Sequence, residues 1–167
     1  MYQDLSLEVP FEGLAGASPI EAGRVRLALA GEAAKIADLE EALQGVRREK
    51  DYTFFLDNKV GEWQVWVLEE VGGALSGVLV SSQHPDWGML GPGVAKNPEG
   101  ALALLWRALD ARRGRTSVVL IPCVESLVVQ SLYGWGARNI ELHTAQSTGI
   151  PPKARGLAFP TFLPESA

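Results

Sequence analysis

The stretch MLGPGVAKNPEGALALLWRAL, from Met89 to Leu109, constrains the fold of this chain more than any other segment. Its first residues are apolar and carry Pro92, which cannot donate to a sheet ladder, so they predict a strand that bulges or loses a partner there. Asn97 and Pro98 are a typical cap and first residue of a helix. The segment therefore predicts a kinked strand leading into a helix N-terminus, an arrangement that can hold an anion.

The segments before this stretch predict a helical pair followed by strands. Residues 24–30 alternate as a strand does, residues 31–45 place apolar side chains at helical spacing, and residues 48–56 form a second, shorter helix. Residues 62–70 and 73–82 then alternate as two strands, with glycines between them for a hairpin turn.

The segments after it predict a strand-helix-strand unit. The helix runs over 98–114, a buried strand over 116–122, a further helix over 125–136, and strands over 137–147 and 157–164. This order predicts an α/β (α+β) fold with a mixed, mostly antiparallel sheet of six to seven strands and about four helices on both faces.

Length and composition predict one domain that acts away from nucleic acid and membranes. The 167 residues suit a single domain, which we assign to 24–167, with 1–23 as an N-terminal arm or irregular lead-in that holds one short strand at most. The net charge of -5 and the absence of a basic cluster disfavour nucleic acid. There is no membrane span or signal-peptide pattern, and the one cysteine, Cys123, suits a reducing, cytoplasmic location.

On this element order and on three pieces of text, the chain resembles the GNAT acetyltransferase superfamily over residues 24–147. The pieces are LGPGVAKNPEGALALL, VVLIP and LYGWGARNIELHTAQ. The nearest branch has a GP-x-VA strand and a P-x-x-A-x-x-LL helix, and its domains often form the second half of a two-domain chain.

The resemblance implies an acyl-CoA dependent N-acyltransferase that binds acetyl-CoA or coenzyme A where the fourth and fifth strands of the family's sheet separate. It places pantetheine against Gly93, Val94 and Ala95 of the kinked strand. The pyrophosphate would lie at the helix N-terminus, beside Asn97, Gly100, Ala101 and Leu102. The acceptor would be a small-molecule or peptide amine.

The helix start departs from the family pattern. No Gln or Arg leads into Gly100, Pro98 removes one N–H donor, and Glu99 adds a carboxylate that repels a diphosphate. An ordinary capped helix start explains NPEG equally well. A wedge sealed by side chains, with the N–H groups of the helix start already bonded to protein atoms, would end the case for a transferase.

Other chemistry-bearing residues give weaker signals. Tyr133 lies near the tyrosine that often serves as general acid in the family, although an aromatic side chain packed at a helix end is the more common explanation. His143 alternates with Glu141 and Ala145, so these three share one face of a strand. No metal-binding motif is present, and we predict no metal.

Two functions stay open. The first is transfer of an acetyl group to an amine. The second is a catalytically degenerate GNAT-fold module that binds a ligand, binds a partner or pairs as a homodimer without transfer. Binding of acetyl-CoA separates the two.

Overall fold

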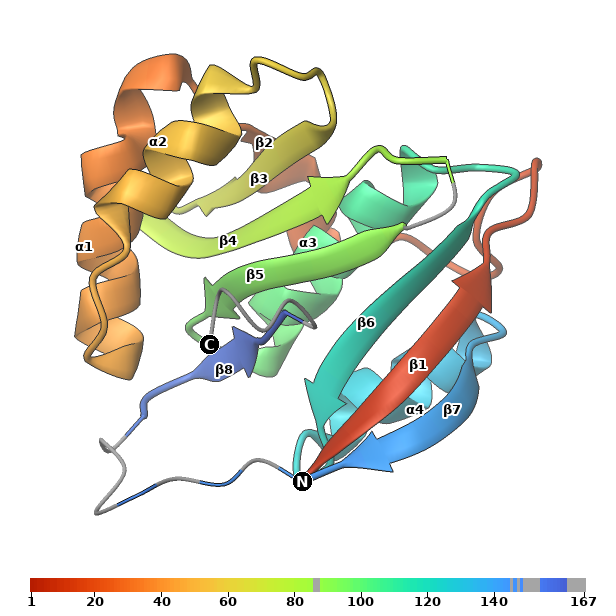
Figure 1. The fold of residues 1–167 in the computed structure, drawn as a ribbon. Coiled ribbons are helices and arrows are strands. Elements are labelled where there is room, and N and C mark those ends of the chain that lie inside the picture. Colours follow the sequence, from red (N-terminus) through yellow and green to blue (C-terminus); the bar gives the residue numbers. More distant parts are fainter. Residues whose placement is uncertain (86–87, 145, 147, 149–153, 162–167) are drawn as a thin grey trace.

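A central mixed sheet organises the protein (Figure 1). The computed structural model describes residues 1–85, 88–144, 146, 148 and 154–161. The strands are β1 (Tyr2–Glu8), β2 (Val25–Leu27), β3 (Trp63–Glu69), β4 (Leu75–Ser82), β5 (Met89–Ala95), β6 (Thr116–Pro122), β7 (Arg138–His143) and β8 (Leu157–Phe159). The helices are α1 (Ala33–Gln44), α2 (Glu49–Asp57), α3 (Pro98–Asp110) and α4 (Ser126–Gly134), with short 3-10 turns η1 (Ile20–Arg24) and η2 (Ala30–Glu32).

The sheet follows the order β2-β3-β4-β5-β6-β1-β7, and β8 pairs with β5 off this path. Strands β2 to β5 are antiparallel, whereas β5 and β6 are parallel. The predicted mixed, mostly antiparallel sheet is therefore confirmed. Of the last predicted strand, the structure describes 157–161, and residues 162–164 lie outside the described residues.

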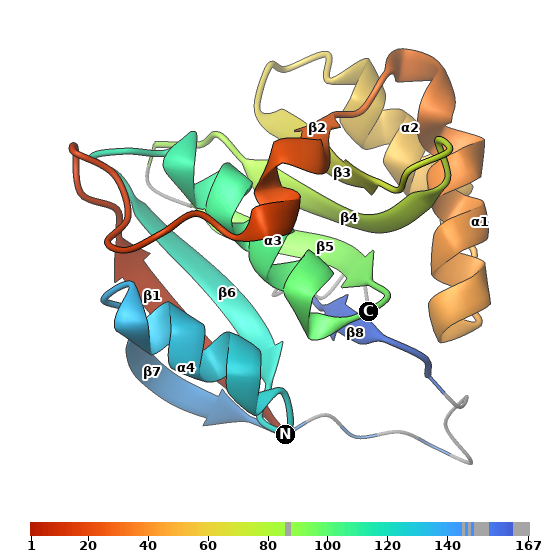
Figure 2. The same cartoon turned by 180° about the vertical axis from the view of Figure 1, so that it is seen from behind.

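Helices cover both faces of the sheet, as predicted. Figures 1 and 2 show α1 and α2 against one face and α3 and α4 against the other. Each side has its own apolar cluster. The cluster on the α1 and α2 side includes Ile36, Tyr52 and Val78, and the larger cluster on the other side includes Leu104, Leu105, Val128 and Ile121.

The N-terminal segment begins with a strand that is part of the sheet, and an irregular segment follows it. Tyr2–Glu8 is a seven-residue strand that lies between β6 and β7 and pairs antiparallel with both. Its odd-numbered apolar residues Leu5 and Leu7 are buried in the larger cluster. The Gly, Pro and Ala content of 1–23 concealed this alternation, because those residues belong to the irregular segment that follows the strand.

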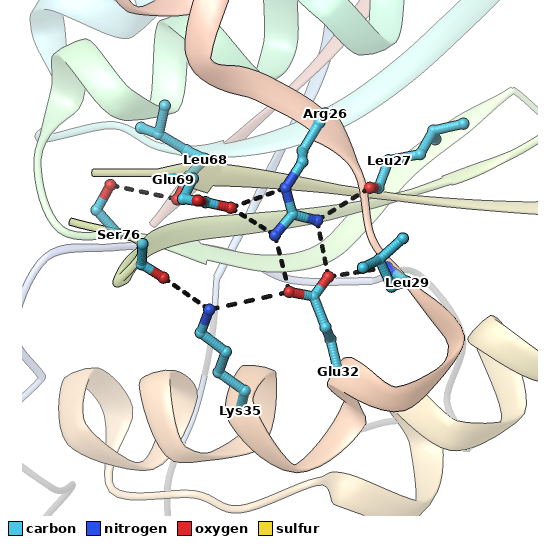
Figure 3. Close-up of polar contacts among 9 residues, drawn as sticks. Arg26, Leu27, Leu29, Glu32, Lys35, Leu68, Glu69 and Ser76 are labelled. Atoms are coloured by element: carbon cyan, nitrogen blue, oxygen red, sulfur yellow. Dashed lines mark hydrogen bonds and ion pairs between the residues drawn. The ribbon is translucent and has the colours of Figure 1, made fainter. Parts of the chain in front are cut away.

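At the end of the sheet formed by β2 and β3, charged side chains form a cluster (Figure 3). Arg26 of β2 donates from Nε to Glu69 of β3 at 2.8 Å, and from Nη1 and Nη2 to Glu32 of η2 at 2.8 Å each. These hydrogen bonds from Arg26 lower the pKa of Glu32 to about 2. The cluster joins the short edge strand β2 to the start of the α1 segment.

Candidate functional site: the wedge between β5 and β6

Strands β5 and β6 separate partway along their length. Among the described residues, they pair only at Met89 with Val118 and at Leu90 with Val119. The next residue, Gly91, has φ of 142°, which side chains rarely adopt, and a Cβ there would lie 2.7 Å from the carbonyl oxygen of Pro160. The predicted bulge and the predicted divergence of the two strands are both present.

The wedge that opens beyond Gly91 is occupied by β8 (Figure 1). Gly93, Val94 and Ala95 pair antiparallel with Phe159, Ala158 and Leu157 in turn. Leu157 and Phe159 are each 1% exposed and belong to the same apolar cluster as the core residues of α3 and α4. The edge of β5 that the sequence analysis assigned to pantetheine is therefore paired with the chain's own C-terminal segment.

The residues before β8 are tied to the end of α1. The N–H of Arg155 donates to the carbonyl oxygen of Leu43 at 2.6 Å, and Gln44 Nε2 donates to the carbonyl oxygen of Arg155 at 3.0 Å. A Cβ on Gly156 would lie 2.3 Å from the carbonyl oxygen of Ala95, so only glycine fits this approach to β5. The segment that leads into β8 is thus held by hydrogen bonds to the end of α1.

Most donors at the start of α3 are already used. Asn97 Oδ1 accepts the N–H of Gly100 at 2.8 Å, and the carbonyl oxygen of Asn97 accepts the N–H of Ala101 at 3.1 Å. Pro98 has no N–H, so Glu99 supplies the remaining amide of the first turn. Gly100 and Ala101 are buried, and Leu102 is partly buried. The N-terminus of α3 is therefore well capped, and few of its N–H groups are left to bind a diphosphate.

A cavity of about 450 Å³ lies on the α1 and α2 side of the wedge. Gly93 and Val94 of β5 and Ala158 of β8 form one wall, and Glu40 and Arg48 line the opposite side. Glu40 is 2% exposed and forms an ion pair with Arg48. The sequence analysis missed this pair because its partners lie on α1 and just before α2, and neither is part of a motif.

Tyr133 lies away from this cavity. Its hydroxyl donates to Gln3 Oε1 of β1 at 2.7 Å, and the residue is 43% exposed at the end of α4. The following tryptophan, Trp135, packs against Trp106 of α3 with ring centroids 5.2 Å apart. The neighbourhood of Tyr133 is that of an aromatic at a helix end, and its role as a general acid stays a prediction.

The described conformation meets the condition that the sequence analysis set against a transferase. Side chains of β8 fill the wedge, and the N–H groups of Gly100 and Ala101 are bonded to protein atoms. The signal for β8 was present in the sequence as the alternation Leu157, Ala158, Phe159, but nothing local showed which strand it would join.

No protein-family model matches the sequence, and no curated protein matches it. Among solved structures, the chain is similar to Saccharomyces cerevisiae N-myristoyltransferase with bound myristoyl-CoA, at 12% identity and a TM-score of 0.52 over 83% of this chain and 46% of that one. It also matches a GCN5-related N-acetyltransferase from Kribbella flavida, at 17% identity and a TM-score of 0.48 over 77% of this chain and 32% of that one.

The chain thus spans less than half the length of either solved structure. No helix in the described part of the chain is long and apolar enough to cross a bilayer. The element order, the parallel β5 and β6 that diverge after two residue pairs, and the likeness to the myristoyltransferase agree with one another. Together they show that this chain has the fold of the GNAT superfamily.

Proposed function

We propose that this chain is an acyl-CoA dependent N-acyltransferase whose cofactor groove is closed by β8 in the conformation described. The observation that carries the proposal is the edge of β5 at Gly93–Ala95, which leaves β6 and pairs with an extended chain. Pantetheine is also an extended chain with amide groups, so it can take the place of β8 on this edge. The likeness to a myristoyltransferase with bound myristoyl-CoA supports a coenzyme A thioester as donor, and we propose acetyl-CoA as that thioester.

The reaction at this edge needs little from side chains. An amine nitrogen forms a bond to the thioester carbonyl carbon while the C–S bond breaks. The thiolate of coenzyme A leaves, and it takes up the proton that the nitrogen loses. Backbone amides of β5 would polarise the carbonyl, and holding both reactants in line supplies most of the acceleration.

The cavity beside Gly93 is the natural place for the acceptor amine. Its wall carries the carboxylates of Glu40 and Asp51, which favour a cationic ammonium group. Arg48 already neutralises Glu40, so Asp51 is the carboxylate that would select for charge. We propose an amine of small-molecule or peptide origin as the acceptor.

For coenzyme A to bind, β8 must first leave the groove, and this displacement costs free energy. Removing Leu157 and Phe159 from the core exposes two fully buried side chains, at about 1.5–3 kcal/mol each. Displacing β8 therefore costs about 3–6 kcal/mol, which weakens the apparent affinity for coenzyme A by roughly 10²- to 10⁴-fold. A groove with an intrinsic dissociation constant of about 1 µM would then bind acetyl-CoA in the full chain with an apparent constant of about 0.1–10 mM.

A non-transferring GNAT-fold module is the second candidate, and the start of α3 favours it. That helix start has two bonded amides, a proline and the exposed carboxylate of Glu99, and a Cβ on Gly100 would lie 3.8 Å from Glu21 Oε2. Glu99 repels a diphosphate, whereas Glu21 is paired with Arg24 at 2.6 Å, and moving β8 does not remove either carboxylate.

Calorimetric titration of acetyl-CoA into matched variants separates the two candidates. The opening variant is the double change Leu157→Asp and Phe159→Asp, which makes β8 unable to stay in the apolar cluster. Ile20→Asp, at a fully exposed residue, is the control for adding a carboxylate. Thermal melts check that each variant folds.

The transferase proposal expects the opening variant to bind acetyl-CoA at least about 100-fold more tightly than the parent chain or Ile20→Asp. Adding Gly100→Asp to the opening variant should remove that binding, because it puts a third carboxylate at the helix start. A folded opening variant that does not bind at millimolar acetyl-CoA would overturn the transferase and leave the non-transferring module.

A further inference from the structure

The last residues of β7 and the middle of β1 bring together three side chains that the wedge does not use. Asp4 of β1 lies opposite Glu141 of β7, and Tyr2 lies opposite His143. One donor atom of each of Asp4, Glu141 and His143 lies within 4.8 Å of the others. All three therefore reach a single point on the sheet surface.

These side chains lie on the sheet face that α4 does not cover. Gln3, the neighbour of Asp4, bonds to Tyr133 of α4, so Gln3 faces that helix. Asp4 points the other way because successive residues of a strand alternate between faces. Figures 1 and 2 show α4 on only one side of β1 and β7. Of the three residues, Asp4 is buried and Glu141 is exposed, so the point where the donors meet lies at the edge of the buried region.

Asp4 is buried, and burial is unfavourable for a lone carboxylate. The residue is 8% exposed, and its Oδ1 is buried without a hydrogen-bond partner in the described part of the chain. A buried, unsatisfied carboxylate oxygen beside two further donors needs a counter-ion or a bound proton.

The two distances from His143 to the carboxylates are compatible with ligands of one cation. His143 Nε2 lies 3.0 Å from Glu141 Oε1 and 3.6 Å from Asp4 Oδ2. Two ligands about 2.1 Å from one tetrahedral ion are about 3.4 Å apart, so both distances fit around a single cation. One imidazole and two carboxylates suit a divalent transition metal such as Zn²⁺.

We propose that Asp4, Glu141 and His143 form a binding site for a divalent transition-metal cation, with Zn²⁺ as the probe ion. The site joins β1 to the edge strand β7, so a bound ion ties the N-terminal strand to its neighbour. Three protein ligands leave at least one coordination position open to water or to an anionic ligand.

Calorimetric titration of Zn²⁺ into the full chain tests the site, with a thermal melt as a second readout. We expect one ion per chain, and a rise in melting temperature that grows with the Zn²⁺ concentration. Asp4→Asn, Glu141→Gln and His143→Ala should each weaken binding by at least about tenfold. Glu141 is exposed, so Glu141→Gln is expected to fold normally.

The chain supplies matched controls for adventitious zinc. His84 is the other of the chain's two histidines, and Cys123 is its one cysteine. His84→Ala and Cys123→Ser should each leave the affinity and the stoichiometry unchanged. The proposal is overturned if the full chain does not bind Zn²⁺ at about 100 µM, or if binding survives both Glu141→Gln and His143→Ala.

Discussion

Phe159 of β8 lies opposite Gly93 of β5, in an antiparallel pair that closes the wedge between β5 and β6. Gly93 is also crowded from the β4 side, where a side chain would have no room. A Cβ on Gly93 would lie 2.4 Å from the carbonyl oxygen of Val78. At the wedge, β5 thus has tight backbone contacts with β4 on one edge and pairs with β8 on the other.

Phe159→Ala should lower the free energy of unfolding by about 3–4 kcal/mol, because the ring is 1% exposed within the larger cluster. Urea denaturation measures this. Phe11→Ala, at a residue that is 81% exposed, is the matched control and should cost below about 1 kcal/mol. Equal effects of the two changes would show that β8 is not packed in the wedge in solution.

Gly93→Ala should destabilise the protein by about 2–3 kcal/mol in the same assay. The added methyl group meets the backbone of Val78 and Leu79, which cannot rotate away as a side chain can. Gly23→Ala is the comparison, since a Cβ there has no heavy atom within 4 Å. If both changes were equally mild, β4 and β5 would have to be farther apart than described.

Glu32→Gln should remove about 1–2 kcal/mol of stability at neutral pH, because Arg26 loses an ionised partner that is largely buried. The pKa of Glu32 is lowered from 4.5 to about 2, so its contribution is complete above about pH 4.5 and is lost as the pH falls toward 2. Thermal melts across this range should show parent and variant converging.

Glu70→Gln controls for a surface ion pair, since Glu70 meets Lys96 with both side chains about 41% exposed. It should change stability by less than about 0.5 kcal/mol at every pH. A gap between the parent chain and Glu32→Gln that stays constant down to pH 2 would contradict the assigned role of Arg26.

Asn97→Ala should cost about 1 kcal/mol, because the N–H of Gly100 loses the Oδ1 acceptor that caps α3. Asn97→Gly should cost only a few tenths of a kcal/mol, since glycine is tolerated at this cap. Chemical denaturation of the two variants side by side gives the difference. The reverse order would mean that Asn97 does not act as the cap.

The sequence by itself determined the local elements around the wedge. Pro92 and its flanking glycines predicted the kink of β5, and Asn97 with Pro98 predicted the start of α3, because these residues act through their own backbone geometry. The order of the elements predicted a mixed sheet, and the order together with three pieces of text carried the resemblance to the GNAT superfamily. These features depend on residues close together in the chain.

Only the tertiary structure decided which strands become neighbours. The alternation in Tyr2–Glu8 and in Leu157–Phe159 shows that each can be a strand, but it does not name a partner. The partner is chosen by long-range packing, which places β1 between β6 and β7 and puts β8 in the wedge. The same long-range choice brings Asp4 to Glu141 and His143, and Glu40 to Arg48, because such groups meet only after the sheet and its helices have assembled.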